Sequence, residues 1–176
     1  PGKDLLIPQS GFQWRFLTTP ADIAIGGGAA GVGKTHALLV DGARHRHIND
    51  FAYMVFRRTN PEIILPGGLW DEVQKLYRKT TGGEATQKPY TWHFPGVERR
   101  RGARIVFNHL QYEDDVYQHH GGQYPAIAFD ELTTFTEKQF WYLVSRNRTD
   151  IGIRPYMRAT TNPQSSGWVK DLIAWY

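Results

Sequence analysis

A glycine-rich stretch near the amino end most constrains how this chain can fold. Residues 28–35 read Gly-Ala-Ala-Gly-Val-Gly-Lys-Thr and fit the pattern G-x-x-x-x-G-K-[ST]. Residues 21–25 before it, Ala-Asp-Ile-Ala-Ile, predict a short buried strand, and residues 36–40 after it predict the first turns of a helix. A glycine-rich turn between a strand and a helix lets backbone N–H groups and the positive end of the helix dipole converge on an anion. The stretch therefore predicts a phosphate-binding loop.

The two side chains that end this loop have distinct expected roles. Lys34 would reach the β- and γ-phosphates of a nucleotide, and the Thr35 hydroxyl would hold Mg²⁺. A glycine-rich turn that binds nothing is the alternative, which the flanking strand and helix and the complete Gly-Lys-Thr ending disfavour. The residues expected to contact the nucleotide are Gly28, Ala29, Ala30, Gly31, Val32, Gly33, Lys34 and Thr35.

Composition limits the class of protein. A length of 176 residues with 40% hydrophobic residues suits one domain with a full core. The absence of cysteine excludes disulfides and thiolate zinc sites. We find no signal peptide and no apolar run long enough to span a membrane. These observations predict a soluble, intracellular protein without a membrane partner.

Basic residues cluster along the chain, although the net charge is only +4. An anionic polymer such as DNA is one ligand for such clusters, and a solvated surface is the alternative. The clusters are residues 44–47, residues 57–58, and residues 99–101 with Arg104.

Short apolar segments alternate with helical ones along the rest of the chain. Residues 1–20 predict an irregular lead-in that contains a short helical turn at residues 13–17. Strands are then predicted at residues 21–25, 51–56, 123–129 and 156–161, and helices at residues 34–48, 69–78, 136–146 and 168–176. Asn60 and Pro61 mark a further helix start, and residues 90–94 and 104–108 predict a hairpin. This order predicts an α/β fold with a mostly parallel central sheet, flanked by helices and extended by an antiparallel hairpin.

A second motif, Ala126-Ile-Ala-Phe-Asp-Glu131, ends a predicted buried strand with two carboxylates. Ligands of open α/β sheets bind at the carboxyl ends of the strands. Asp130 would therefore hold Mg²⁺ opposite Thr35, and Glu131 would polarise the attacking water as a general base. A plain turn at the end of a strand is the alternative, which the complete phosphate loop upstream disfavours.

A third motif ends the predicted strand at residues 156–161. Its polar residues Thr160, Thr161 and Asn162 would face the γ-phosphate if the strand lies in the same sheet. From there they could sense hydrolysis and pass it to the rest of the protein. An ordinary turn is the alternative, because Asn162-Pro163 is a turn-forming pair.

Together these motifs resemble the N-terminal packaging ATPase domain of the large terminase subunit of tailed bacteriophages. The resemblance extends over nearly the whole chain. Gln13-Trp-Arg-Phe-Leu17 resembles the adenine-binding Q motif of that family, and Thr160-Thr-Asn162 resembles its coupling motif. Residues 28–35 resemble Walker A, residues 127–131 resemble Walker B with its catalytic glutamate, and residues 121–124 and 145–148 also fit phage terminases.

The resemblance implies an ASCE-type P-loop ATPase that uses ATP and Mg²⁺. It implies hydrolysis that drives double-stranded viral DNA into a procapsid, in the cytoplasm of the infected host cell. It also implies a portal protein, a small terminase subunit and a homo-oligomeric ring as partners. In this reading Gln13 contacts adenine, and Lys34, Glu131 and Asn162 take part in catalysis and coupling.

The chain departs from the family pattern in its arginines. Residues 28–35 contain no arginine, and residues 119–122 before the second motif read His-His-Gly-Gly. A contact from arginine to the γ-phosphate must therefore come from elsewhere. Arg146 and Arg148 are the candidates, in the same subunit or across a subunit interface. A salt bridge or a contact to a DNA phosphate is the alternative role for each.

The second departure concerns the nuclease domain of full terminases, which nothing in the sequence supplies. The acidic residues 113–115 predict a solvated helix start and not a metal site. We therefore expect residues 1–176 to form a single ATPase domain without the nuclease. Two other functions stay open: a helicase-like or recombinase-like P-loop ATPase, and a nucleotide-binding module whose ATP only controls assembly.

Overall fold

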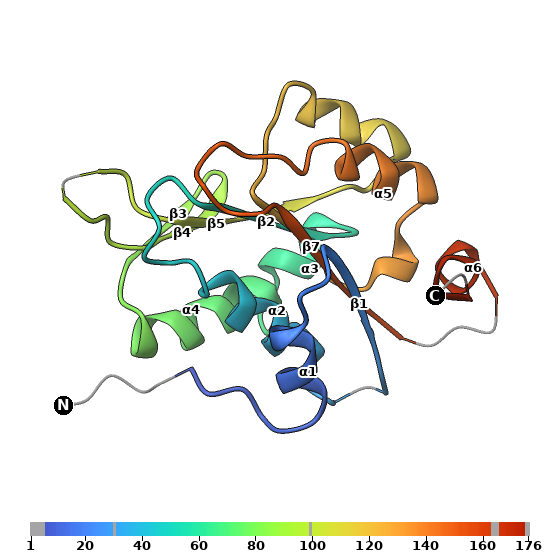
Figure 1. Ribbon diagram of the computed structural model, residues 1–176, viewed down its shortest axis with the longest axis horizontal. Coiled ribbons are helices and arrows are strands. Elements are labelled where there is room, and N and C mark those ends of the chain that lie inside the picture. The colour runs from blue at the N-terminus through green and yellow to red at the C-terminus, as the bar shows by residue number, and fades with distance from the viewer. Residues whose placement is uncertain (1–5, 30, 99, 163–165, 175–176) are drawn as a thin grey trace.

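A seven-stranded sheet forms the centre of the computed structural model, which describes residues 6–29, 31–98, 100–162 and 166–174 (Figure 1). The strand order is β1-β7-β6-β2-β5-β4-β3; the first five strands in this order run parallel, and β4 and β3 continue the sheet antiparallel. The bounds are β1 Ile23–Gly27, β2 Ala52–Arg57, β3 Glu84–Gln87, β4 Tyr90–His93, β5 Arg104–His109, β6 Ala126–Phe129 and β7 Tyr156–Thr161.

Helices cover both faces of this sheet (Figure 1). One face carries α1 (Phe12–Thr18), α2 (Lys34–Gly42), α3 (Asn60–Ile64) and α4 (Leu69–Thr80). The other carries the 3₁₀ segments η1 (Glu113–His119) and η2 (Leu132–Thr134) with α5 (Glu137–Val144) and α6 (Trp168–Ala174). None of the helices that the structure describes is long and apolar enough to cross a membrane.

Two apolar cores lie between the sheet and these helix layers. Successive side chains of a strand point to opposite faces, so β2 contributes to both cores. Tyr53 and Val55 pack on the side of α2 and α4, while Met54 and Phe56 pack on the side of α5. Burial on both faces explains why the parallel strands read as continuous apolar runs in the sequence.

The predicted α/β arrangement, its parallel strands and its antiparallel hairpin are confirmed. The strand β3 was not predicted, because all four of its residues are exposed polar or small residues without an apolar period. The helix predicted at residues 34–48 ends at Gly42, where turns begin. A Cβ at Gly42 would lie 2.7 Å from Ile105 Cδ1, so this glycine permits close packing on β5 at the cost of helix propensity.

Two strand boundaries also differ from the prediction. β1 lies two residues further along the chain than residues 21–25, because Gly26 and Gly27 pair with Thr160 and Thr161 of β7. β6 begins at Ala126 and not at residue 123. Pairing with neighbouring strands, which a single segment does not reveal, decides both boundaries.

Candidate active site

Four neighbouring parallel strands bring their carboxyl ends to one edge of the sheet. β1 leads into the glycine-rich loop, β7 ends at Thr161, β6 leads into Asp130, and β2 ends at Arg57. The register places Gly27 beside Thr161, and Phe129 beside both Ala159 and Phe56. The three motifs of the sequence therefore meet where ligands of open α/β sheets bind.

The loop between β1 and α2 has the geometry of an anion site. Gly31 and Gly33 have positive φ values of 84° and 75°, which favour glycine. Gly33 caps α2, whose first-turn N–H groups have no partner within the helix. The Lys34 ammonium lies over the loop and donates to the carbonyls of Gly28 at 2.6 Å and Ala29 at 2.8 Å. Ala30, a predicted nucleotide contact, lies outside the described residues.

Asp130 is the centre of the hydrogen-bond network at this edge. Its carboxylate is buried, with 1% of the side chain exposed. Thr35 Oγ1 donates to Oδ2 at 3.0 Å, and Thr160 Oγ1 donates to Oδ1 at 2.6 Å. The Thr35 contact joins the loop directly to the carboxylate at the end of the strand.

The donor chemistry around Asp130 fits Mg²⁺. Magnesium takes oxygen ligands and is usually held by one or two carboxylates together with substrate phosphates and water. Thr35 and Asp130 present a hydroxyl and a carboxylate within 3.0 Å of each other. No group of three His, Asp or Glu side chains suited to a metal exists among the described residues. The Thr35 hydroxyl and the Asp130 carboxylate are two oxygen ligands of the kind that Mg²⁺ takes.

Glu131 stands next to this centre in a strained backbone conformation. Its φ of 63° is uncommon for a residue other than glycine, and such strain occurs often at active sites. Its N–H donates to Thr160 Oγ1 at 3.1 Å, so one hydroxyl contacts both acidic residues. The Glu131 side chain is 39% exposed and can therefore meet water.

Arg57 is a site residue that the motif analysis missed. Its Nη2 lies 2.5 Å from Asp130 Oδ2, and its Nη1 lies 3.8 Å from Glu131 Oε1. Its Nε is buried and has no hydrogen-bond partner within the described part of the chain. The available signal was its position directly after the predicted strand at residues 51–56. Arg58 instead donates to Gln139 Oε1 at 2.9 Å, so this pair does not form the basic surface cluster considered from the sequence.

Arg146 and Arg148 lie at the opposite end of the sheet. The Arg146 carbonyl accepts from the N–H of Tyr124, just before β6, and the Asn147 amide donates to the carbonyls of Tyr124 and Tyr156. The four residues of β6, about 13 Å of extended chain, separate this end from Asp130. The structure therefore does not bring either arginine to the phosphate loop of its own subunit.

Asn162 follows β7 and is exposed at the site edge of the sheet. Its carbonyl accepts from Thr161 Oγ1 at 3.1 Å. Pro163, the last residue of that motif, lies outside the described residues.

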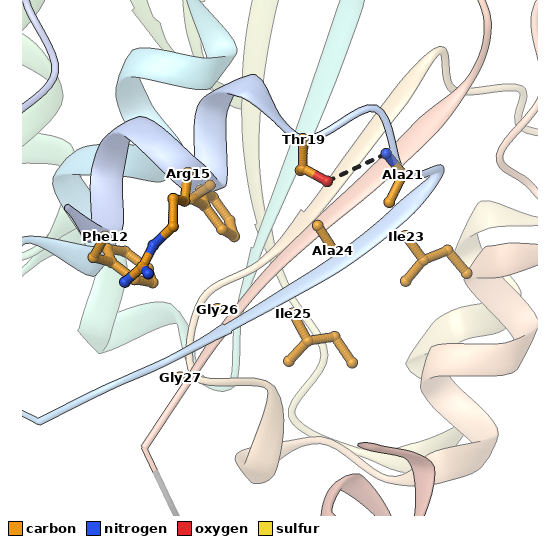
Figure 2. A pocket seen from close by; sticks show the side chains of 10 residues that line it. Phe12, Arg15, Thr19, Ala21, Ile23, Ala24, Ile25, Gly26 and Gly27 are labelled. Carbon is orange, nitrogen blue, oxygen red and sulfur yellow. Dashed lines mark hydrogen bonds between the residues drawn. The ribbon is translucent and has the colours of Figure 1, made fainter. Parts of the chain in front are cut away.

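Gln13 lies against the loop, and its amide makes two hydrogen bonds to the backbone. It is 2% exposed; its Oε1 accepts from the N–H of Gln9 at 2.9 Å and its Nε2 donates to the Gly33 carbonyl at 3.3 Å. Beside it a pocket of about 420 Å³ opens between α1 and β1. Figure 2 shows Phe12 and Arg15 reaching from α1 into this pocket, beside Gly26 and Gly27 at the start of the loop.

With this geometry in place, comparison with known proteins gives a family. A model of the N-terminal part of the terminase large subunit, of the T4likevirus type, matches residues 25–176. The chain belongs to this family. Among curated proteins, none matches the terminase chain.

Solved structures of large terminases and of a DNA packaging motor share its fold. The large terminase of a thermophilic bacteriophage superposes with a TM-score of 0.68 at 14% identity, over 89% of this chain and 40% of that one. The large terminase ATPase domain of Thermus phage P74-26 gives 0.60 at 14% identity, over 93% and 68%. The Phi-28 gp11 DNA packaging motor gives 0.57 at 16% identity, over 94% and 53%. The chain thus spans less than half of the thermophilic phage terminase, which is also solved with ATP-γ-S.

Proposed function

We propose that this terminase domain hydrolyses ATP to drive double-stranded viral DNA into a procapsid. The observation that supports this most directly is the contact between Thr35 and Asp130, 3.0 Å apart, with Glu131 next in the chain. It supports a site in which a phosphate loop, a metal-binding pair and an exposed carboxylate act together. The terminase family match and the fold shared with a DNA packaging motor support DNA packaging as the process that this reaction drives.

The loop would bind the phosphates of the nucleotide, and the strand ends would help to bind the metal. Lys34 would leave the carbonyls of Gly28 and Ala29 and neutralise the β- and γ-phosphates. Thr35 and Asp130 would hold Mg²⁺, which when bound neutralises charge on the phosphates. The base would lie in the pocket between α1 and β1, against Phe12. That the thermophilic phage terminase was solved with ATP-γ-S supports an adenine nucleotide as the ligand.

Glu131 would act as the general base. A water oxygen attacks the γ-phosphorus, the bond from that phosphorus to the β,γ-bridging oxygen breaks, and ADP and phosphate form. The proton that the water loses passes to Glu131, whose exposed carboxylate can contact solvent. The strained backbone of Glu131, tied to Thr160, would keep the carboxylate in place.

Arg57 and Asn162 would change their contacts when the nucleotide binds and is hydrolysed, and so would couple hydrolysis to conformational change. Arg57 would hold the two carboxylates together in the absence of nucleotide and release Asp130 when a metal binds. Asn162 would respond to the γ-phosphate at the end of β7. Arg146 and Arg148 remain our candidates for a contact that a neighbouring subunit supplies in a ring, because they lie away from their own loop. The portal protein and the small terminase subunit would complete the motor in the host cytoplasm.

A triplex-displacement assay with ATP, DNA and portal tests the proposal. We expect the protein to release phosphate and to displace a third strand without separating the duplex. Separation of a forked duplex would instead identify a helicase. ATP-dependent assembly without any phosphate release, even with DNA and portal present, would identify a module in which ATP controls assembly alone.

A further inference from the structure

The amino ends of β2 and β5 carry two basic segments that the proposed nucleotide site does not use. Residues 43–51 connect α2 to β2, and residues 94–103 connect β4 to β5. The phosphate loop lies at the carboxyl end of the same sheet, and the six residues of β2, about 20 Å of extended chain, separate the two ends (Figure 1). A ligand bound to these segments would therefore not occupy the nucleotide site.

Backbone and side-chain contacts hold these two segments together. Asn49 Nδ2 donates to the Val97 carbonyl at 3.2 Å, and Asn49 Oδ1 accepts from the Val97 N–H at 3.0 Å. The Asp50 N–H donates to the Arg101 carbonyl at 3.0 Å, and Arg100 Nη2 lies 3.4 Å from Asp50 Oδ2. Asn49 and Val97 are 48 positions apart in the sequence, so tertiary folding joins the two segments into one surface.

We call residues 43–51, 94–98 and 100–104 the basic surface. Its exposed basic side chains are Arg44, Arg46, His47, Arg100 and Arg101. Arg44 pairs with Asp41 at 3.5 Å, and Arg100 pairs with Asp50. Within the described part of the chain, Arg46 and Arg101 form no ion pair with a carboxylate. Two cations of the surface therefore have no neutralising acid partner among these residues.

Like charges lie close together on the basic surface. Burial, and then the charge of Arg101, lower the pKa of Arg104, whereas the charge of Asp50 raises it. Burial, and then the charges of Arg101 and Arg104, also lower the pKa of His93 at the end of β4. Both arginines stay charged at neutral pH, because a guanidinium loses its proton only at very high pH. Their mutual repulsion opposes this arrangement, and a bound anion would relieve it.

We propose that the basic surface contacts the phosphate backbone of double-stranded DNA. This inference rests on the proposed function, and it assigns the contact with DNA to a specific surface of the domain. The planar guanidinium group donates two parallel hydrogen bonds to a phosphate, so arginine is suited to this ligand. Contacts to the backbone carry no sequence information, which suits DNA that moves past the protein.

The composition of the basic surface favours DNA over a protein partner. The centre of a protein–protein interface is depleted in charged residues and enriched in aromatic and other apolar side chains. Among the described residues of the basic surface, Val97 is the one large apolar side chain that is exposed, at 48%. A protein partner would therefore find no apolar centre to bury, whereas a phosphate backbone needs none.

Fluorescence anisotropy of a labelled duplex, titrated with Mg²⁺ and ATP-γ-S at several salt concentrations, tests the proposal. The test variant combines Arg46→Gln with Arg101→Gln, which removes two exposed cations and breaks no ion pair among the described residues. We expect its DNA affinity at about 0.1 M salt to fall by about tenfold or more, and the slope of log affinity against log salt to decrease in magnitude by about 2. The affinity for ATP-γ-S should stay unchanged, because the phosphate loop lies at the other end of the sheet.

Two further variants are the controls. Arg78→Gln with Lys79→Gln removes the same charge from exposed positions of α4, and should change DNA affinity by less than about threefold. Arg46→Lys with Arg101→Lys keeps the charge of the basic surface, and should keep the salt slope of the wild type.

The outcomes separate the inference from the proposed function. Unchanged DNA affinity in the test variant, or an equal loss in the α4 control, would overturn the inference and leave the proposed function intact. A test variant that keeps its DNA affinity and loses binding to the portal protein would identify a protein interface, which also overturns the inference. If the wild-type protein binds neither duplex DNA nor nucleotide, the proposed function itself fails. If the test variant does not fold, the two single variants replace it, and each should reduce the salt slope by about 1.

Discussion

Arg57 and Asp130 form an ion pair of 2.5 Å between the ends of two adjacent strands, β2 and β6. The guanidinium occupies the Oδ2 oxygen that also accepts from Thr35. A protein cation therefore already contacts the oxygen expected to bind a metal. The competition between these two cations leads to the first prediction.

Replacing Arg57 with Gln should lower the Mg²⁺ concentration needed for nucleotide binding, because it removes the competing charge. It should also slow ATP hydrolysis by about tenfold or more, because Glu131 loses its cationic neighbour at 3.8 Å. A Mg²⁺ titration with a fluorescent ATP analogue measures the first effect. Arg57→Lys, which retains charge, is the control and should lie between the variant and the wild type. An unchanged Mg²⁺ midpoint in Arg57→Gln would contradict the competition.

Replacing Glu131 with Gln should preserve ATP binding and reduce turnover by about a hundredfold or more, because the amide cannot accept the proton of water. Phosphate release with DNA present and equilibrium ATP binding are the two measurements. Glu137→Gln, on the nearby helix α5, should leave both unchanged. Turnover near the wild-type rate in Glu131→Gln would rule out the general-base role.

Replacing Thr160 with Val should destabilise the folded protein by about 1–3 kcal/mol, because both Asp130 and the N–H of Glu131 lose a buried partner. The free energy of unfolding in urea measures this loss. Thr161→Val is the matched control: the Thr161 hydroxyl contacts only the Asn162 carbonyl among the hydrogen bonds of the described residues. Equal effects of the two substitutions would show that the link to the carboxylates is not what stabilises this edge.

The stability of the protein should fall as the pH drops from about 6.5 to about 4, in part because of His45. Burial, helped by the charges of Arg44 and His47, lowers the pKa of His45 from 6.5 to about 4. The unfolded chain therefore binds a proton over this interval that the folded protein does not bind, which favours unfolding. Urea unfolding of His45→Gln should show a shallower loss across this window. The exposed His36→Gln serves as the control, and parallel pH profiles for wild type and His45→Gln would contradict the prediction.

Two contiguous motifs in the sequence indicated which segments would meet at the candidate site. The loop at residues 28–35 and the Asp130-Glu131 pair are contiguous and follow apolar strands, so their meeting at one sheet edge follows from the parallel topology. Arg57 belongs to no comparable motif, since an arginine pair at the end of a strand is equally compatible with a surface charge. The position of Arg146 and Arg148 depends on Asn147, which ties that segment to the amino ends of β6 and β7. Contacts of that kind join residues far apart in the chain and leave no periodic signal.

The pairing of β1 has a mechanical consequence. Among the described residues, β1 exchanges backbone hydrogen bonds with β7 alone, matched residue for residue from Ile23 with Met157 to Gly27 with Thr161. The strand that leads into the glycine-rich loop and the strand that precedes Asn162 therefore share a single register within the sheet. In the proposed motor, a pull on the chain beyond Asn162 would reach the phosphate loop through β7 and its neighbour β1, so load and nucleotide affinity would depend on each other.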